Sequence, residues 1–165
     1  MLLNRPVMSL RTGTQVATTV DAVINPTNLK VEGFYCQPTD NKKRLVLLYQ
    51  DIRDIIPQGV VVNDLEVLSE PDELVRLKEV MSLHFELVGK QVVTVNKEKV
   101  GKVSDYATET TTMFVQKLYV AQSLLKSFTG GNLGIDRTQI VEITDKKVVI
   151  QELAQKVPAG ATAAA

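Results

Sequence analysis

The feature that most constrains the fold of this chain is a weak internal repeat, because tandem copies of one pattern predict tandem copies of one structural module. The segment Val16–Asp21 aligns with Val100–Asp105. At the same offset Val31–Tyr35 aligns with Val115–Tyr119, which places the tyrosines at the ends of these segments over each other. The chain of 165 residues has the length for two small modules of about 70–80 residues each.

Further along the chain the offset between the copies grows by four residues. There Asp51–Ile55 aligns with Gln139–Ile143, and Val60–Val62 aligns with Val148–Ile150. Surface loops tolerate changes of length at little cost in free energy, so two copies of one fold can differ there. The length change falls between the third and fourth apolar runs, in two segments with the composition of turns: 38–43 and 126–132.

Each copy has the pattern of several short β-strands, rich in valine, threonine, isoleucine and tyrosine and separated by polar turns. In the first copy we expect strands over Gln15–Ile24, Val31–Gln37, Arg44–Tyr49, Arg53–Ile56 and Gly59–Val62. In the second copy we expect them over Val92–Val95, Lys99–Tyr106, Met113–Ala121, Ile140–Ile143 and Lys147–Ile150. Many short strands predict an all-β barrel or sandwich rather than a parallel sheet.

A single helix is predicted between the two copies. Ser69 is the expected N-cap, followed by proline and acidic residues in the first turn, and the helix should extend over Pro71–Ser82. Apolar residues recur there at helical spacing: Leu74, Leu77, Val80 and Met81. Such a stripe either binds a partner or packs on the chain's own β modules, and the second interpretation needs no further molecule.

The chain resembles the PRC-barrel superfamily, which includes a domain of the photosynthetic reaction-centre H subunit and the C-terminal part of ribosome maturation factors. The resemblance lies in Leu87–Val93, in Gly101–Tyr106 with its G-x-V-x-D pattern, and in the closing pair of strands over Thr138–Ile150. The first copy departs from the pattern at Ala17, where the family has glycine. The resemblance covers nearly the whole chain.

The resemblance implies two small, strongly bent β-barrels in tandem, joined by a short α-helical linker. We expect a first barrel over 1–66, the linker over 67–85, a second barrel over 86–157 and a disordered tail over 158–165. Members of the superfamily serve as docking or assembly modules, and they have no shared catalytic residues. The resemblance therefore implies no cofactor and no metal.

The charge and composition of the chain limit the classes of function that we expect for it. The chain has 19 basic and 19 acidic residues, a balance that argues against direct nucleic-acid binding. It contains no apolar run near the roughly 20 residues needed to span a bilayer. Cys36 is the only cysteine, which excludes an intramolecular disulfide and fits a reducing, cytoplasmic location.

Candidate catalytic residues are few. His84 is the only histidine, and with Cys36 it makes no plausible zinc site. Cys36 follows two aromatic residues in an apolar strand, which favours a buried hydrophobic role over a nucleophilic one. Asp21 and Asp105 occupy equivalent strand ends, and they are either a carboxylate pair for acid–base chemistry or, as we expect, caps of the following turns.

The densest basic run is Lys42, Lys43 and Arg44, which we take as the candidate partner contact. The alternative is a solvated loop. Four aromatic residues that could stack on bases stand in strand patterns that favour packing in the barrel walls: Tyr35, Tyr106, Phe114 and Tyr119.

Without a catalytic constellation, the sequence favours a non-enzymatic adaptor or assembly protein that binds another protein or a ribonucleoprotein through its barrel surfaces. Two alternatives follow from the family resemblance: a ribosome-maturation or RNA-processing factor, and a peripheral assembly factor for a membrane complex. An enzyme with residues gathered from distant positions is the remaining hypothesis.

Overall fold

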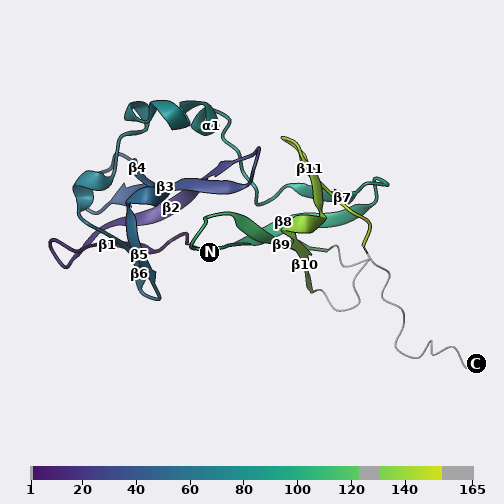
Figure 1. The fold of residues 1–165 in the computed structure, drawn as a ribbon, viewed down its shortest axis with the longest axis horizontal. Coiled ribbons are helices and arrows are strands. Elements are labelled where there is room, and N and C mark those ends of the chain that lie inside the picture. Colours follow the sequence, from purple (N-terminus) through teal and green to yellow (C-terminus); the bar gives the residue numbers. More distant parts are fainter. Residues whose placement is uncertain (1, 123–130, 154–165) are drawn as a thin grey trace, which may run out of the picture.

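The computed structural model describes residues 2–122 and 131–153 and shows a mainly β protein built from two sheets. Figure 1 shows the first sheet, in purple and blue, beside the second, in green and yellow, along the long axis of the molecule. Each sheet has six strands. The mainly β character predicted from the sequence is thus confirmed.

The first sheet has the strand order β4-β3-β2-β1-β6-β5. All neighbouring strands are antiparallel except β1 and β6, which are parallel. A short 3-10 helix, η1 (Tyr49–Asp51), separates β4 from β5. The strands are β1 (Pro6–Ser9), β2 (Gln15–Asn25), β3 (Lys30–Pro38), β4 (Leu45–Leu48), β5 (Ile52–Ile56) and β6 (Gly59–Val62).

The second sheet repeats this arrangement with the order β10-β9-β8-β7-β12-β11. Its one parallel pair, β7 and β12, corresponds to β1 and β6. A 3-10 helix again precedes the last two strands, η5 (Arg137–Gln139). The strands are β7 (Gln91–Thr94), β8 (Lys99–Thr108), β9 (Val115–Ala121), β10 (Asn132–Asp136), β11 (Ile140–Ile143) and β12 (Lys147–Ile150).

The register of the strands matches between the sheets residue by residue. Asp21 lies opposite Tyr35 after a β-bulge in β2, and Asp105 lies opposite Tyr119 after a bulge in β8. Positions in β2 and β3 therefore correspond to positions 84 residues later, and positions in β4, β5 and β6 to positions 88 residues later. The blocks aligned in the sequence occupy equivalent places, and the length change lies between β3 and β4 and between β9 and β10.

Two strands were missing from the sequence prediction. β1 is only four residues long and begins with Pro6, so its alternation is too short to stand out. β10 carries Gly134 between Leu133 and Ile135, and its first residue, Asn132, was assigned to a turn. Residues 126–130 of that predicted turn and the predicted tail at 158–165 lie outside the described residues.

The predicted helix over Pro71–Ser82 is wrong in its extent. The segment forms two 3-10 turns, η3 (Pro71–Glu73) and η4 (Val75–Leu77), and only then the short helix α1 (Lys78–Ser82). Leu74, between the turns, has φ −89° and ψ 69°, which is outside the helical region and interrupts the hydrogen-bond ladder. Ser69 is not the N-cap because its backbone pairs with Val46 at the edge of β4.

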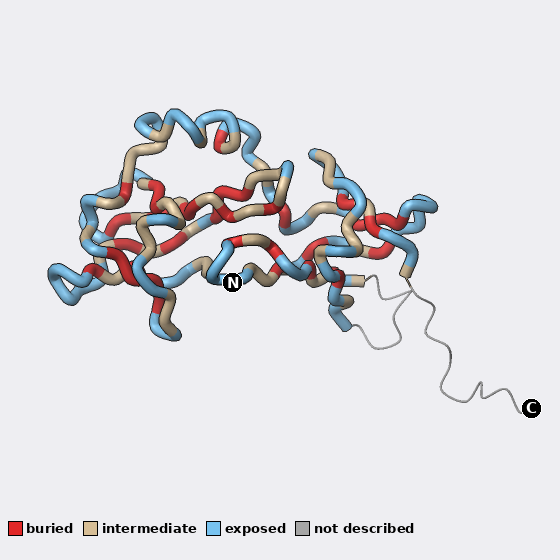
Figure 2. The backbone as a smooth tube through the Cα atoms, viewed as in Figure 1, coloured by how far each residue is buried: buried red, intermediate tan, exposed pale blue. Residues whose placement is uncertain are grey.

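The main hydrophobic core is one cluster that includes buried residues from both sheets. Buried positions, red in Figure 2, follow the strands of both halves of the molecule. A smaller cluster joins the linker to the first sheet: Met81 and its neighbours Leu74, Leu77 and Val80 pack on Val23, Val46, Tyr35 and Leu48. The apolar stripe of the linker thus covers the chain's own sheet. Among the described residues, no helix has the length and apolarity required to cross a membrane.

Candidate binding sites where the two sheets meet

The sheets meet through an isolated antiparallel β-bridge between Lys30 and Phe114. These residues occupy equivalent positions in the two sheets: Lys30 is the first residue of β3, and Phe114 immediately precedes the equivalent strand β9. Because each position contacts its own counterpart, the contact has an approximate local two-fold symmetry. Two reciprocal hydrogen bonds flank the bridge: Val31 N–H donates to Met113 O at 2.8 Å, and Val115 N–H donates to Leu29 O at 2.9 Å.

The backbone at the bridge adopts an unusual conformation on both sides. Leu29 has φ 56° and Met113 has φ 62°, which places two bulky residues in the left-handed region. Both side chains are buried, at 3% and 2% exposure. Burial of these side chains and the reciprocal hydrogen bonds offset the strain of this backbone conformation, so the surrounding structure holds the bridge in place.

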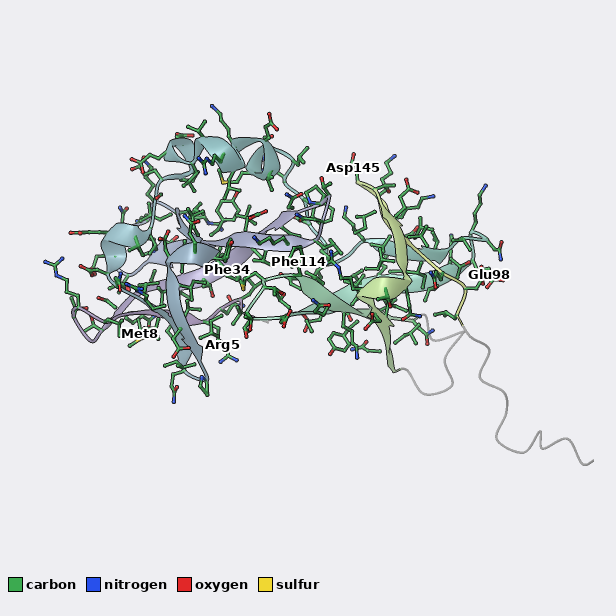
Figure 3. The ribbon with its side chains drawn as sticks, in the orientation of Figure 1. Arg5, Met8, Phe34, Glu98, Phe114 and Asp145 are labelled. Atoms are coloured by element: carbon green, nitrogen blue, oxygen red, sulfur yellow. The ribbon has the colours of Figure 1, made fainter. Side chains whose placement is uncertain are left out.

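Four side chains form a row of alternating aromatic rings and cations beside the bridge. The Lys30 ammonium lies 4.2 Å from the centre of the Tyr49 ring and 5.9 Å from that of Phe114, labelled in Figure 3. The Phe114 ring also contacts a second cation, because the Arg137 guanidinium lies 4.9 Å from the centre of this ring. The Lys30 ammonium also donates a hydrogen bond to the Tyr49 hydroxyl at 3.1 Å, which raises the pKa of Lys30.

Arg137 connects the two sheets directly. Its Nη1 donates to the carbonyl oxygen of Val115 at 3.1 Å, within its own sheet. Its Nη2 donates to the carbonyl oxygen of Asn28 at 2.6 Å, in the turn between β2 and β3 of the first sheet. These donors satisfy two carbonyl groups at the junction, so removing the guanidinium would leave both without that partner.

Two grooves lie at equivalent positions on either side of this contact. The first, of about 420 Å³, is lined by η1 and β5 of the first sheet and by the β8–β9 turn of the second. The second, of about 360 Å³, is lined by η5 and β11 of the second sheet and by the β2–β3 turn of the first. Each groove thus needs both sheets. Their linings differ in where the charges stand. Arg53 and Asp54 in the first groove correspond to Val141 and Glu142 in the second, whose cation, Arg137, stands at the position equivalent to Tyr49.

A third cleft lies between the end of the linker and both sheets. One part of it, of about 310 Å³, is lined by Asp21 and Ala22 of β2, Phe85 and Glu86 of the linker end, and Tyr106 of β8. A neighbouring pocket beneath α1 shares Asp21, Ala22, Ile24, Phe85 and Glu86 with it, and Tyr35 and His84 add to the lining of that pocket. We call the whole space the linker cleft.

Tyr106 is the buried polar residue of the linker cleft, with 6% of its surface exposed. Burial, together with the nearby carboxylates of Asp21 and Asp105, raises the pKa of Tyr106 to about 12. The phenol is therefore neutral at physiological pH.

The two aspartates do not end their strands, so the prediction that they cap turns is wrong. Asp21 and Asp105 lie inside β2 and β8, next to the bulges. Each accepts a hydrogen bond from the next backbone N–H, at 2.8 Å for Ala22 and 2.7 Å for Tyr106. A bulge leaves such an amide outside the regular ladder, and the adjacent carboxylate supplies the missing acceptor.

Cys36 is fully buried in β3, and its sulfur lies 3.6 Å from the carbonyl oxygen of Phe34. Burial raises the pKa of the Cys36 thiol to about 12, so the reactive thiolate is scarce. His84 is exposed just after α1, with φ 44°. Within residues 2–122 and 131–153, no group of three His, Cys, Asp or Glu side chains is placed to hold a metal ion.

The basic run lies in the exposed loop before β4 and does not act as one cationic patch. The Lys43 ammonium pairs with the Glu70 carboxylate at 2.7 Å, and this hydrogen bond raises the pKa of Lys43. Lys42 and Arg44 are exposed and form no ion pair with other described residues. The pairing with Glu70 lowers the net positive charge that this loop could offer to a phosphate.

Sequence reasoning missed the row of Lys30, Tyr49, Phe114 and Arg137. The signal was present in the alignment, because the offset of 84 pairs Lys30 with Phe114 and the offset of 88 pairs Tyr49 with Arg137. A cation and an aromatic residue are exchanged at both pairs of positions. Two coupled exchanges in one repeat indicate positions that contact each other.

No family model matches the chain, and no curated protein matches it. What we propose about function therefore rests on the geometry of the described residues.

Proposed function

We propose that this protein is a non-enzymatic adaptor or assembly protein, that its two halves are PRC-type barrel modules, and that it binds another macromolecule through surfaces built from both. One observation carries the proposal. The reciprocal bridge at Lys30 and Phe114 joins two sheets of the same strand order and forms two equivalent grooves, each lined by both sheets.

Equivalent grooves with different linings suit a partner that is contacted at two places. The first groove offers Arg53 and Asp54, of opposite charge, whereas the second offers the exposed Val141 beside Glu142. Two linked contacts raise the overall affinity through effective concentration even where each contact is weak. Different linings mean that the two contacts involve different segments of the partner.

The strands beside the grooves can themselves receive a partner. β5 and β11 are edge strands, and no strand among the described residues pairs with their outer sides. An extended segment could add to such an edge through backbone hydrogen bonds, while the groove accepts its side chains. The bulges at Asp54 and Glu142 interrupt both edges and would limit the length of added strand.

The test is an affinity pull-down from source-cell lysate at low and moderate salt, with mass spectrometry of the eluate. We expect a reproducible protein partner that survives moderate salt. Asp54→Lys and Glu142→Lys change equivalent grooves, so each should reduce recovery and the double variant should reduce it further. Recovery that neither variant alters would contradict binding through the grooves.

The same experiment separates the alternatives. Ribosomal proteins and RNA that are lost at moderate salt would favour the ribosome-maturation function and would draw attention to Lys42, Lys43 and Arg44. Components of a membrane complex in the eluate would favour the assembly factor for such a complex. An eluate without any reproducible partner would count against the adaptor function itself.

A further inference from the structure

We infer that the linker cleft binds a basic side chain, an arginine or lysine, presented by a protein partner. This deepens the proposed function by naming the chemistry of one contact. The part of the cleft of about 310 Å³ joins a hydroxyl that has no hydrogen-bond partner among the described residues, two carboxylates and apolar walls. Each of these features matches one part of a long cationic side chain.

The hydroxyl of Tyr106 is the first of these features. It forms no hydrogen bond with the described residues, although Tyr106 as a whole is only 6% exposed. Among the described residues that are not exposed, every fully buried side-chain oxygen or nitrogen has a hydrogen-bond partner. The hydroxyl oxygen is therefore not fully buried, and since Tyr106 lines the cleft, we infer that this oxygen accepts a hydrogen bond from a ligand there.

The charge of the cleft is the second feature. Asp21 and Glu86 line it, while no lysine or arginine is among its lining residues. Asp21 uses one carboxylate oxygen for the Ala22 amide, and no described residue bonds its other oxygen or the Glu86 carboxylate. Lys90 lies outside the lining, with its ammonium 4.6 Å from the centre of the Phe85 ring. Acceptors without donors favour a cation.

The walls of the cleft are the third feature. Apolar side chains line it: Leu3, Ala22, Ile24, Phe85, Leu87 and Val88. Arginine and lysine bury their methylene stems against such surfaces while the charged head reaches polar groups. The two carboxylates, which belong to exposed residues, would repel an anion, and a neutral polar ligand would form no charge-assisted contact with them.

A difference between the repeats explains why the space exists. The register places Ala22 and Tyr106 at equivalent positions, and both line the cleft. Leu3 and Val88 precede the first strand of their sheets at equivalent places and also line it. A second tyrosine in place of Ala22 would enlarge the wall by a whole ring, so the small residue leaves room for a ligand over Tyr106.

The experiment is an NMR titration of the full chain with the capped tripeptide acetyl-Gly-Arg-Gly-amide, compared with the same peptide carrying neutral citrulline. The lysine peptide is the third arm. We expect saturable shifts of the Ala22, Glu86 and Tyr106 amides with a Kd on the order of 1 mM for the arginine peptide. The lysine peptide should bind as well or up to about threefold more weakly, since it lacks the guanidinium fork. The citrulline peptide should produce no saturable shift at these amides.

Asp21→Asn and Tyr106→Phe test the two acceptors. Asp21→Asn keeps an oxygen for the Ala22 amide and should weaken binding of the arginine peptide roughly tenfold, because it removes a charge-assisted contact. Tyr106→Phe should weaken binding by about threefold, the effect of one neutral hydrogen bond. The matched control is Asp54→Asn. The Asp54 carboxylate also stands at a bulge and accepts the next backbone N–H, that of Ile55 at 2.8 Å, but it lies in β5 outside the cleft lining, so the change should alter the Kd by less than about twofold.

Three results would overturn the inference: equal binding of the citrulline peptide, shifts confined to other surfaces, or equal effects of Asp21→Asn and Asp54→Asn. These results are separable from the proposed function. A partner recovered in the pull-down together with a cleft that binds no peptide would leave the adaptor function standing and reject the cleft. Peptide binding without any recovered partner would reject the adaptor function and keep the cleft.

Discussion

The two sheets share strand order and register but differ in the side chains at their contact. Lys30 and Tyr49 form a cation–aromatic pair in the first sheet, and Arg137 and Phe114 form one in the second with the two roles exchanged. Two copies of the first sheet joined in this way would bring Lys30 against Lys30. Two copies of the second would lose the contact between Lys30 and Phe114. The exchange therefore favours pairing between unlike halves, which is the pairing within one chain.

The outer faces of the sheets differ as well. On the first sheet the linker packs against Val23, Val46 and Leu48. The equivalent positions of the second sheet hold the smaller or polar Ala107, Gly134 and Asp136. The linker therefore packs on only one of two similar sheets, because only that sheet offers an apolar face to it.

Phe114→Lys should have the largest effect, because it places a second cation opposite Lys30 and removes the ring that contacts Arg137. We expect the free energy of unfolding to fall by about 3 kcal/mol. Hydrogen exchange of the Val31 and Val115 amides should accelerate together, since these amides form the reciprocal bonds. The control is Phe114→Tyr, which keeps the ring and should change stability by less than about 1 kcal/mol. Unchanged exchange at both amides in Phe114→Lys would contradict the role of the row.

Met81→Ala tests the second difference between the sheets. Met81 is 9% exposed in the small cluster between linker and first sheet, and its loss should lower the free energy of unfolding by about 2 kcal/mol. Val75, which is 78% exposed on the same linker, provides the control. Val75→Ala should stay within about 0.5 kcal/mol in chemical denaturation. Equal effects of the two substitutions would show that the linker does not rest on the first sheet.

Gly101→Ala and Ala17→Gly exchange one pair of equivalent positions. A Cβ at Gly101 would clash with the carbonyl oxygen of Ala121, so Gly101→Ala should destabilise the protein by about 2 kcal/mol. Ala17 is fully buried in the first sheet, and removing its methyl group should cost about 1 kcal/mol through lost burial and added chain entropy. Urea unfolding measures the free energy of unfolding of both variants. Gly101→Ala as stable as the unsubstituted protein would contradict the expected clash at this position.

Cys36→Val makes the first sheet resemble the second, where the equivalent position is Val120. Both positions are fully buried, so the change at neutral pH should stay within about 0.5 kcal/mol. The difference should grow in alkaline solution. Burial raises the pKa of the thiol from 9.0 to about 12, so the folded state holds its proton more tightly than the unfolded state.

The stability that depends on this proton is fully present below pH 9 and is lost as the pH rises toward 12. Between these values the unmodified protein should lose about 1.4 kcal/mol per pH unit relative to Cys36→Val. Denaturation curves of both proteins at pH 8 and pH 10 measure this. An equal change in the free energy of unfolding of the two proteins between pH 8 and pH 10 would contradict the burial of Cys36.

The sequence by itself determined the β character of the chain and the correspondence between its two copies. Strand-forming residues alternate locally, and that alternation is visible without knowledge of the contacts. Hence Val16–Asp21 and Val100–Asp105 were placed correctly in equivalent strands. The buried position of Cys36 could be predicted for the same reason. Short or interrupted patterns, such as Pro6–Ser9 and Asn132–Asp136, carried too little of this local signal.

Only the tertiary structure decided how the copies meet and what lies between them. The bridge joins Lys30 to Phe114 across 84 residues of chain, and no local pattern specifies so distant a contact. The linker shows the same limit, because Leu74 leaves the helical conformation in a segment whose apolar spacing predicts a continuous helix. The linker cleft depends on how the two copies meet and on the conformation of the linker. Tyr106 comes from one sheet, Asp21 from the other and Glu86 from the linker end. Packing between distant elements, which sets such positions, outweighs local propensity.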